Sequence, residues 1–423
     1  MVASLSGAST YALFNATLVT LAPLAARLPK GGPVSEDDLG LVKGGVLVVE
    51  DGVIKAAGSR EACAQAISEL LVRQRASLPE IDMRGDVVMP GFVDAHTHAL
   101  FAGNRIADFD ALIAGEKPLL GIRYTVEQTR ACGIEALVAI GRRHLGLMRA
   151  HGTTTAEIKS GYALTAEGEG AMLQAMRMLD QDNAMPRVVA TFCGAHALPP
   201  EFEDFDAFTD ALVTDFLPVV SDLGIARFAD AFCETGFFSV EQSRRFLQAC
   251  AAKGMGLRIH ADELAASGGA KLAAQLHCTS ADHLNYIGED DIAALRESST
   301  TAVLCPTTAE FLGLARRAPA RALIEAGVPV ALATDFNPGT SPCYSLQAVA
   351  HSARRSLHMS SPEVIAGLTL YPALSLGLGQ KVGALAPGRL ADLVVLDTPD
   401  YRELSYFFGG NLVRTTLCGV KND

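Results

Sequence analysis

Short apolar runs alternate with amphipathic stretches along most of the chain beyond residue 89. The apolar runs are rich in Val, Ile and Ala and are bounded by Gly, Asp or Asn, which is typical of buried strands. Eight such strands are predicted, at 87–95, 153–158, 188–193, 227–233, 257–261, 279–283, 301–305 and 329–334.

Between these strands, apolar residues return at helical spacing, for example in 134–150, 166–179, 240–252, 268–276 and 290–297. Eight strand–helix units fit an α/β fold of the (β/α)8 TIM-like barrel type. An open doubly wound sheet is the alternative, but no G-x-G-x-x-G motif follows an early strand. The barrel is therefore the predicted architecture.

The two ends of the chain have a different pattern. Residues 1–88 contain short strands and turns, including an Asp51-Gly52 hairpin signal, and 59–75 has helical character. Strand-and-turn patterns return after about residue 384 in a segment too short to fold alone. We therefore expect 1–88 and 385–423 to form one small composite β-sandwich domain, and 89–384 to form the catalytic barrel.

Composition and charge narrow the class of partner. The chain has 423 residues, 49% of them hydrophobic, and a net charge of −12. This charge argues against nucleic acids and anionic membranes as partners, and no apolar run is long enough to span a bilayer. The nine cysteines include no C-x-x-C pair and indicate a reducing, cytoplasmic compartment.

The first barrel strand ends in His96 and His98. Residues i and i+2 of an extended strand point the same way, so both imidazoles can face one point. Later strands also end in polar residues: His196 follows the third strand, His260 the fifth and His283 the sixth, and Asp335 follows the eighth. The carboxyl ends of barrel strands share one face, so these side chains should meet there.

Three neutral imidazoles and one carboxylate can hold a divalent cation and leave a position open for water. Such a cation lowers the pKa of that water towards about 7. Glu263 could take the proton and deliver it to a leaving nitrogen, and His283 could polarise a substrate carbonyl. The expected reaction is hydrolysis at an sp² carbon bonded to nitrogen.

Longer motifs resemble a known family. From about residue 12 to 420 the chain is similar to the imidazolonepropionases, a branch of the amidohydrolase superfamily that acts in histidine degradation. The matching motifs are residues 90–98 (PGFVDAHTH), 101–105 (FAGNR), 157–162 (EIKSGY), 194–201 (GAHALPPE), 260–263 (HADE), 280–284 (SADHL) and 333–341 (ATDFNPGTS).

The resemblance implies an enzyme that opens 4-imidazolone-5-propanoate to N-formimino-L-glutamate. It implies one Zn²⁺ or Fe ion per chain and a homodimer. The implied metal ligands are His96, His98, His260 and Asp335, and the implied catalytic residues are Glu263, His283 and Asp335. The implied substrate-binding residues are Arg105, Tyr162, His196, Glu263, Asn337, Gly339 and Thr340. Arg105 also makes chemical sense, because a guanidinium binds a carboxylate tail with two hydrogen bonds.

One segment departs from the family pattern. Residues 114–124 are shorter and lack the usual run of glycines, although Thr125-Val126 and Thr129-Arg130 remain. If this loop closes over the substrate ring, the substrate could instead be a hydantoin or thioxo-imidazolidinone with the same propionate tail.

Three other functions are compatible with parts of the pattern. A heterocycle deaminase would share the metal site but would not need Arg105, Tyr162 and the 337–340 turn. A two-metal hydrolase needs a carboxylated lysine after the fourth strand, where the chain reads Phe232-Cys233-Glu234. A non-catalytic binding protein would not need the full set of ligands and proton-transfer residues. Five histidines have no predicted role: His144, His151, His277, His351 and His358.

Overall fold

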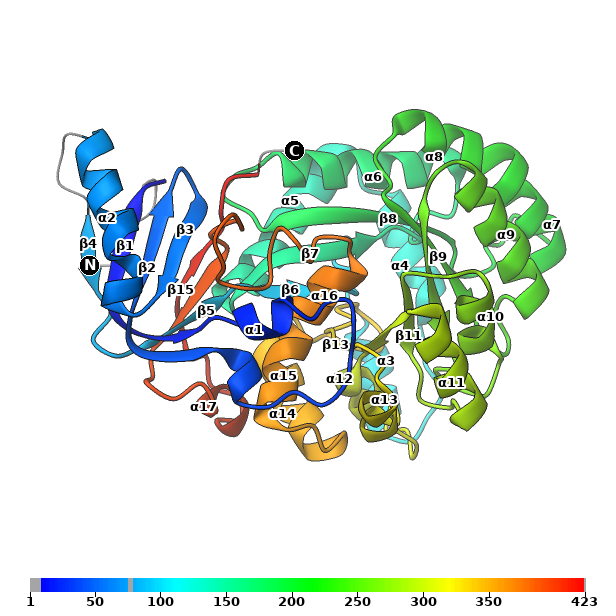
Figure 1. Ribbon diagram of the computed structural model, residues 1–423. Coiled ribbons are helices and arrows are strands. Elements are labelled where there is room, and N and C mark those ends of the chain that lie inside the picture. The colour runs from blue at the N-terminus through cyan, green and yellow to red at the C-terminus, as the bar shows by residue number, and fades with distance from the viewer. Residues whose placement is uncertain (1–8, 75–78, 422–423) are drawn as a thin grey trace.

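Eight parallel strands form the larger of two sheets in the computed structural model, which describes residues 9–74 and 79–421 (Figure 1). Neighbours in the sheet follow chain order, as in a (β/α)8 barrel. The strands are β6 (Phe92–Asp94), β7 (Thr153–Lys159), β8 (Arg187–Ala195), β9 (Phe228–Cys233), β10 (Gly256–Ala261), β11 (Ser280–His283), β12 (Thr301–Leu304) and β13 (Val330–Leu332).

The first predicted strand is wrong in one respect. The run 87–95 is divided into β5 (Val87–Pro90), which pairs in the smaller sheet, and β6, which opens the barrel. The division falls at Pro90-Gly91, where Pro90 has no N–H to donate and a Cβ on residue 91 would overlap the Thr154 side chain. The chain passes from one sheet to the other at this point.

The barrel is closed by contacts just beyond the ends of β6 and β13. Asp335 N donates to His96 O and His98 N donates to Phe336 O, both at 3.0 Å. The buried Asp94 carboxylate accepts hydrogen bonds from Thr334 N at 3.1 Å and Thr334 Oγ1 at 2.6 Å. These bonds bring the histidine pair of the first strand beside the aspartate of the last.

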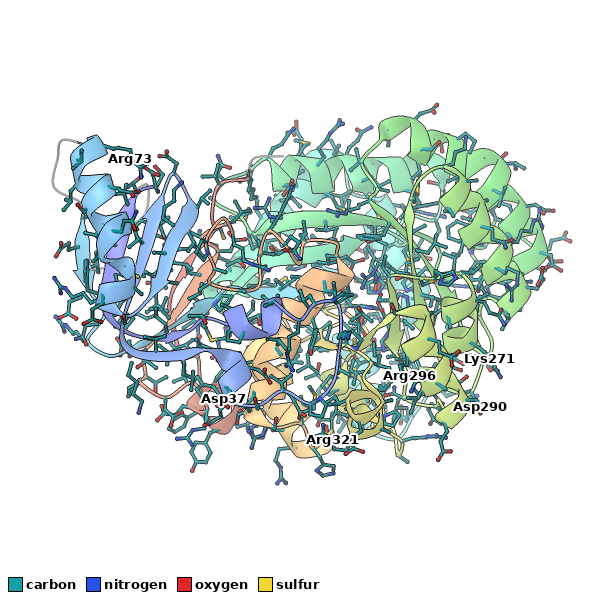
Figure 2. The ribbon with its side chains drawn as sticks, viewed as in Figure 1. Asp37, Arg73, Lys271, Asp290, Arg296 and Arg321 are labelled. Atoms are coloured by element: carbon teal, nitrogen blue, oxygen red, sulfur yellow. The ribbon has the colours of Figure 1, made fainter. Side chains whose placement is uncertain are left out.

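The helices surround the barrel with apolar residues packed inward, and most of their outer faces are polar, although Ile106, Phe109 and Ile113 of α3 are exposed. Figure 2 shows Lys271, Asp290 and Arg296 pointing outward from α10 and α11. In the part of the chain described, no helix combines the length and apolar character needed to cross a membrane. The helices are α3 (Ile106–Ile113), α4 (Gly121–Arg130), α5 (Ile134–Ala150), α6 (Ala166–Asp180), α7 (Phe205–Ala211), the π-helix η3 (Leu212–Phe216), α8 (Leu217–Leu223), α9 (Val240–Ala252), α10 (Gly269–Gln275), α11 (Glu289–Ser298), α12 (Pro306–Phe311), α13 (Ala320–Ala326), α14 (Leu346–Ser356), α15 (Ser361–Leu368) and α16 (Leu370–Ser375).

Both ends of the chain contribute to the smaller sheet (Figure 1). Its order is β15-β14-β5-β1-β2-β3, and β4 pairs with β1. A bridge between Val53 and Leu390 links the last strand of this path to the segment before β14. The remaining elements are β1 (Tyr11–Val19), α1 (Ala22–Ala25), the 3-10 helix η2 (Asp37–Leu39), β2 (Leu41–Glu50), β3 (Val53–Gly58), α2 (Arg60–Gln74), β4 (Glu80–Asp82), β14 (Leu393–Leu396), α17 (Glu403–Tyr406) and β15 (Val413–Leu417).

This smaller sheet has apolar residues on both faces. Leu13, Leu47 and Val395 belong to one buried cluster, while Cys63 and Leu70 of α2 pack over the other face. The predicted fold class, a barrel with a second β domain built from both termini, is confirmed. The domain bounds themselves stay a prediction, and residues 1–8, 75–78 and 422–423 of those domains lie outside the described residues.

Candidate metal centre and substrate pocket

A cavity of about 280 Å³ lies at the carboxyl ends of the barrel strands. It brings together residues that are up to 242 positions apart in the sequence, since His98 and Thr340 both contact it. Ten of its lining residues are among those predicted from the sequence: His98, Arg105, Tyr162, His196, His260, Glu263, His283, Asp335, Asn337 and Thr340.

Four predicted ligands converge at one end of this cavity. His96 Nε2 lies 3.4 Å from Asp335 Oδ1, and His98 Nε2 lies 3.8 Å from the same oxygen. The Nε2 atoms of His98 and His260 are 3.2 Å apart. Two ligands bound tetrahedrally at zinc-like distances are separated by about 3.3 Å, so this spacing suits a shared cation.

In two of these rings, a buried carboxylate beside Nδ1 favours a proton on that nitrogen. Asp282 Oδ2 lies 2.6 Å from His96 Nδ1, and Asp230 Oδ1 lies 2.7 Å from His260 Nδ1. A proton on each Nδ1 leaves a lone pair on each Nε2, directed at the common point. Among the described residues, His96 Nε2 is buried without a hydrogen-bond partner. The arrangement therefore fits a cation, which can accept electron density from several facing lone pairs at once.

The protonation of the rings agrees with this fit. Burial lowers the pKa of His96 and of His98 well below the ordinary value, and the neighbouring positive groups add to the effect. Both rings are therefore neutral and able to act as ligands near pH 7.

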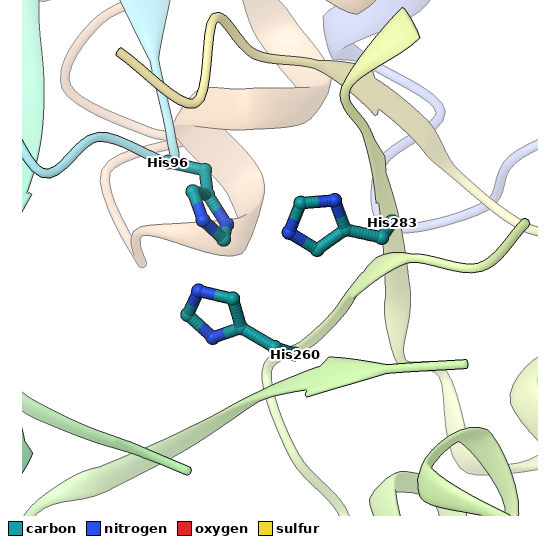
Figure 3. A group of neighbouring side chains, drawn as sticks. All are labelled: His96, His260 and His283. Atoms are coloured by element: carbon teal, nitrogen blue, oxygen red, sulfur yellow. The ribbon is translucent and has the colours of Figure 1, made fainter. Parts of the chain in front are cut away.

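His283 lies beside the same point. Figure 3 shows the rings of His96, His260 and His283 facing one another, and ligand atoms of these three residues lie within 4.8 Å of one another. His283 Nδ1 is 3.7 Å from Glu263 Oε1. Neither ring nitrogen of His283 has a hydrogen-bond partner within the described chain. His283 can therefore reach either the cation or a substrate.

A layer of fully buried charged residues contacts the predicted ligands. Lys159 Nζ lies 2.9 Å from Glu157 Oε1 and 2.7 Å from Asp230 Oδ2. Arg258 Nη2 donates to Ala95 O at 2.6 Å and lies 3.3 Å from Asp282 Oδ2. Although burial alone would raise it, the pKa of Asp230 is held well below its usual range by His260 and Lys159.

Sequence reasoning did not assign a role to this layer. The signal was present, because Glu157, Lys159, Asp230, Arg258 and Asp282 each interrupt an apolar strand. A charged residue in a buried strand must be paired, and a set of both signs at matching depth in the barrel predicts such a layer.

Arg105 lies at the other end of the cavity, where α3 begins. Its guanidinium lies over Gly339, and a Cβ on residue 339 would overlap it. Arg105 Nε is 3.1 Å from Asp108 Oδ2, so one edge of the guanidinium faces a carboxylate. Gly339 therefore provides the space for Arg105.

Tyr162 and His196 form a wall between these two ends. Tyr162 is 3% exposed, and its ring centroid lies 5.4 Å from that of His196. The Glu169 carboxylate holds the Tyr162 loop by accepting hydrogen bonds from the amides of residues 161, 163 and 164 at 2.8 to 3.1 Å. His196 Nδ1 lies 3.0 Å from the Gly161 carbonyl oxygen, which links the two walls.

The Asn337 side chain is used within its own turn. Its Oδ1 accepts hydrogen bonds from Gly339 N at 2.8 Å and Thr340 N at 2.7 Å, and its Nδ2 donates to Asp335 O at 2.7 Å. These bonds tie the turn to the predicted ligand Asp335. The predicted contact of Asn337, Gly339 and Thr340 with the ligand stays a prediction.

The rest of the cavity wall is apolar and was not predicted. Phe232, Phe237, Leu264 and Leu312 line it, and so does Ile122 from the start of α4. The divergent segment 114–124 therefore reaches the cavity through Ile122. Apolar wall residues of this kind have no motif that distinguishes them from core residues.

Three of the histidines without a predicted role make hydrogen bonds away from the cavity. His144 Nδ1 lies 2.8 Å from Ala99 O, and His151 Nδ1 lies 3.0 Å from Ser345 Oγ. His351 Nδ1 lies 3.1 Å from Ser405 O. These rings have packing roles.

Comparison with known proteins agrees with the barrel fold. A profile of the amidohydrolase family matches residues 87–422. The imidazolonepropionase of Bdellovibrio bacteriovorus is 41% identical over 93% of this chain and 91% of its own length. That of Rubrobacter xylanophilus is 43% identical over 92% and 94%. A 5-methylcytosine deaminase from Klebsiella pneumoniae, 17% identical, matches 96% of this chain and 95% of its own with a TM-score of 0.71.

Proposed function

We propose a site for each step of one reaction, because the chain belongs to the amidohydrolase family and, within it, to the imidazolonepropionases. These enzymes open 4-imidazolone-5-propanoate to N-formimino-L-glutamate in histidine degradation. The single observation that carries the proposal is the cavity, which has the predicted ligands His98, His260 and Asp335 at one end and Arg105 at the other. The reacting ring occupies the first end and the propionate tail the second.

His96, His98, His260 and Asp335 hold one divalent cation in this proposal. The support is the spacing of their donor atoms, 3.2 to 3.8 Å, and the direction of their lone pairs. When bound, the cation supplies Lewis-acid activation of water and of the substrate carbonyl. Thr308 Oγ1 donates to Asp335 Oδ2 at 2.9 Å and keeps the other carboxylate oxygen turned to the site.

Glu263 moves the proton. It accepts a proton from the water that adds to the ring carbonyl carbon and gives it to the ring nitrogen as the C–N bond breaks. Burial, together with the nearby Asp335 and Glu234 carboxylates, raises the pKa of Glu263 well above its usual value. This direction suits a group that must take up and return a proton near neutral pH.

His283 and Arg105 orient the substrate. Burial lowers the pKa of His283 well below the ordinary value, so its neutral ring can donate one hydrogen bond to the carbonyl oxygen. Arg105 binds the propionate carboxylate, and Tyr162 and His196 pack along the chain between tail and ring.

The buried lysine argues against a two-metal reaction. A bridging carbamate requires a neutral lysine amine, whereas Lys159 lies between Glu157 and Asp230. Burial alone would lower the pKa of Lys159, but these carboxylates raise it above its ordinary value. Lys159 is therefore an ammonium ion and unavailable as a carbamate.

The test is to mix metal-loaded enzyme with imidazolone propionate and follow the imidazolone absorbance. We expect the absorbance to disappear and N-formimino-L-glutamate to form without release of ammonia. Release of ammonia with an intact ring would indicate a deaminase instead. Turnover of a hydantoin or thioxo-imidazolidinone propionate, without turnover of the imidazolone, would assign the site to a related ring.

Three finer features belong to the same proposal. The metal is Zn²⁺ or Fe, because imidazole and carboxylate ligands suit both, and elemental analysis of the purified protein separates them. A cytoplasmic location is supported by nine cysteines that are all free in the described chain. A homodimer stays a prediction, and sedimentation velocity tests it by measuring the oligomeric state.

A further inference from the structure

Asp108 connects two parts of the substrate pocket, Arg105 and the start of α4. It lies in the first turn of α3, three residues after Arg105, and is 6% exposed. Its Oδ2 is 3.1 Å from Arg105 Nε and 2.9 Å from Gly121 N, while its Oδ1 is 2.6 Å from Leu120 N. One carboxylate thus contacts both the guanidinium and the start of α4.

The first of these contacts orients Arg105. Asp108 Oδ2 forms an ion pair with Arg105 at 3.1 Å from Nε without a hydrogen bond, and a Cβ on residue 339 would overlap the guanidinium. In the part of the chain that the structure describes, no other carboxylate lies within ion-pair distance of Arg105. The two terminal nitrogens are therefore available to a ligand, in a side chain that has already lost much of its rotamer freedom.

The second contact fixes the segment that departs from the family pattern. Leu120 is the N-cap of α4 and Gly121 is its first residue, and backbone N–H groups at this end have no partner within the helix. Asp108 supplies that partner and a negative charge at the positive end of the helix dipole. The next residue, Ile122, lines the cavity. Asp108 thus fixes the end of the short 114–120 connection and, through it, the position of Ile122 in the cavity wall.

We propose that Asp108 is a positioning residue that couples Arg105 to the start of α4 and so makes the pocket selective for a substrate with a short carboxylate tail. The proposal rests on the proposed function, because it concerns the tail end of the same pocket. It also explains why the segment can lack its glycine run: a carboxylate from α3 anchors the chain where it enters α4.

The test compares two substrates, imidazolone propionate and the corresponding propionamide, in wild type and in Asp108→Asn. The asparagine keeps the shape and removes the charge that orients Arg105. We expect KM for the acid to rise on the order of tenfold, the loss typical of one charge-assisted contact, and kcat to change less than about twofold. KM for the amide should change less than about twofold, since it makes no ion pair with Arg105.

Two variants control the test. Asp110→Asn removes an exposed carboxylate from the same helix and should leave both substrates unaffected. Asp108→Glu restores the charge and should recover part of the selectivity for the acid. If Asp108→Asn fails to fold, Asp108→Glu still decides: the charge is kept but moved by one methylene, so KM for the acid should rise by less than the loss expected of Asp108→Asn, and KM for the amide should not change.

Failure of the inference can be told from failure of the proposed function. If wild type does not open imidazolone propionate, the proposed function is wrong. If wild type does so and Asp108→Asn affects acid and amide equally, Asp108 only supports the fold and the inference is overturned. A fall in KM for the acid would also overturn it, because the carboxylate would then compete with the substrate.

Discussion

Asp335 has conflicting demands, because it must be charged to bind a cation but lies in a buried position. Burial raises its pKa to about 7, even though His260 and Thr308 favour the charged form. The metal-free protein therefore keeps a proton on Asp335 up to about that pH, and a cation must displace it. The histidine ligands His96 and His98 do not compete, since their pKa values are lowered.

We predict that zinc affinity falls about tenfold per pH unit as the pH drops below about 7, which is the slope for release of one proton. A competition titration against a chelating dye between about pH 8 and about pH 6 measures this slope. Asp335→Asn should bind zinc more weakly and with a flatter pH dependence. Equal zinc affinity across this range in wild type would contradict the titration of Asp335.

The carboxylates behind the ligands set the ligand orientation. Asp282→Asn and Asp230→Asn remove the charge that holds His96 and His260 by Nδ1. Each variant should lose about 10- to 100-fold in zinc affinity, as is usual when the partner of a metal-bound histidine is changed. Asp290→Asn, on the outer face of α11, is the matched control (Figure 2). Unchanged zinc affinity in both buried variants would show that their charges only balance Lys159 and Arg258.

At the scale of elements, the loop between β7 and α6 is held by one side chain. Glu169 accepts three backbone hydrogen bonds on either side of Tyr162, and it lies in the first turn of α6. Glu169→Gln should lower the free energy of unfolding by about 1–3 kcal/mol and raise KM for the substrate, because a loosened loop no longer places Tyr162. Glu167→Gln, exposed in the same turn, should change neither. Thermal unfolding and steady-state kinetics measure both effects. An altered melting temperature with unchanged KM would show that Glu169 does not position Tyr162 for substrate binding.

Hydrophobic periodicity predicted the helices and strands well, but it did not predict where one element passes into the next. The helices at 134–150 and 240–252 were predicted to the residue, because long amphipathic stretches begin and end with clear signals such as the Ser239 capping box. The strand 87–95 was predicted as one element because its apolar run is continuous. Only the tertiary structure reveals that Pro90-Gly91 separates two sheets.

The site residues that lie at the ends of strands could be predicted from the sequence. Histidines at the ends of strands meet by the rule that all carboxyl ends of a barrel share one face. Asp108 and Glu169 could not be found this way, because they act through backbone amides of other segments. Hydrogen bonds from a carboxylate to the backbone of a neighbouring loop have no fixed spacing in the sequence that would indicate them.

For the whole molecule, the proposed cation would join the first, fifth and last strands of the barrel. We expect metal binding to stabilise the fold, by about 2.7 kcal/mol when free zinc is 100 times the dissociation constant. The melting temperature of metal-depleted protein should therefore rise with added zinc. In His96→Ala the same additions should have little effect. An equal rise in wild type and variant would place the stabilising metal elsewhere.

One cation, bound by His96, His98, His260 and Asp335, should be sufficient for the ring-opening reaction. A titration of metal-depleted protein with Zn²⁺ or Fe²⁺, in which the loss of imidazolone absorbance is measured, tests this. We expect the rate to rise linearly up to one metal ion per chain and then to stay constant. Full activity without metal, or a rate that keeps rising to two ions per chain, would contradict it.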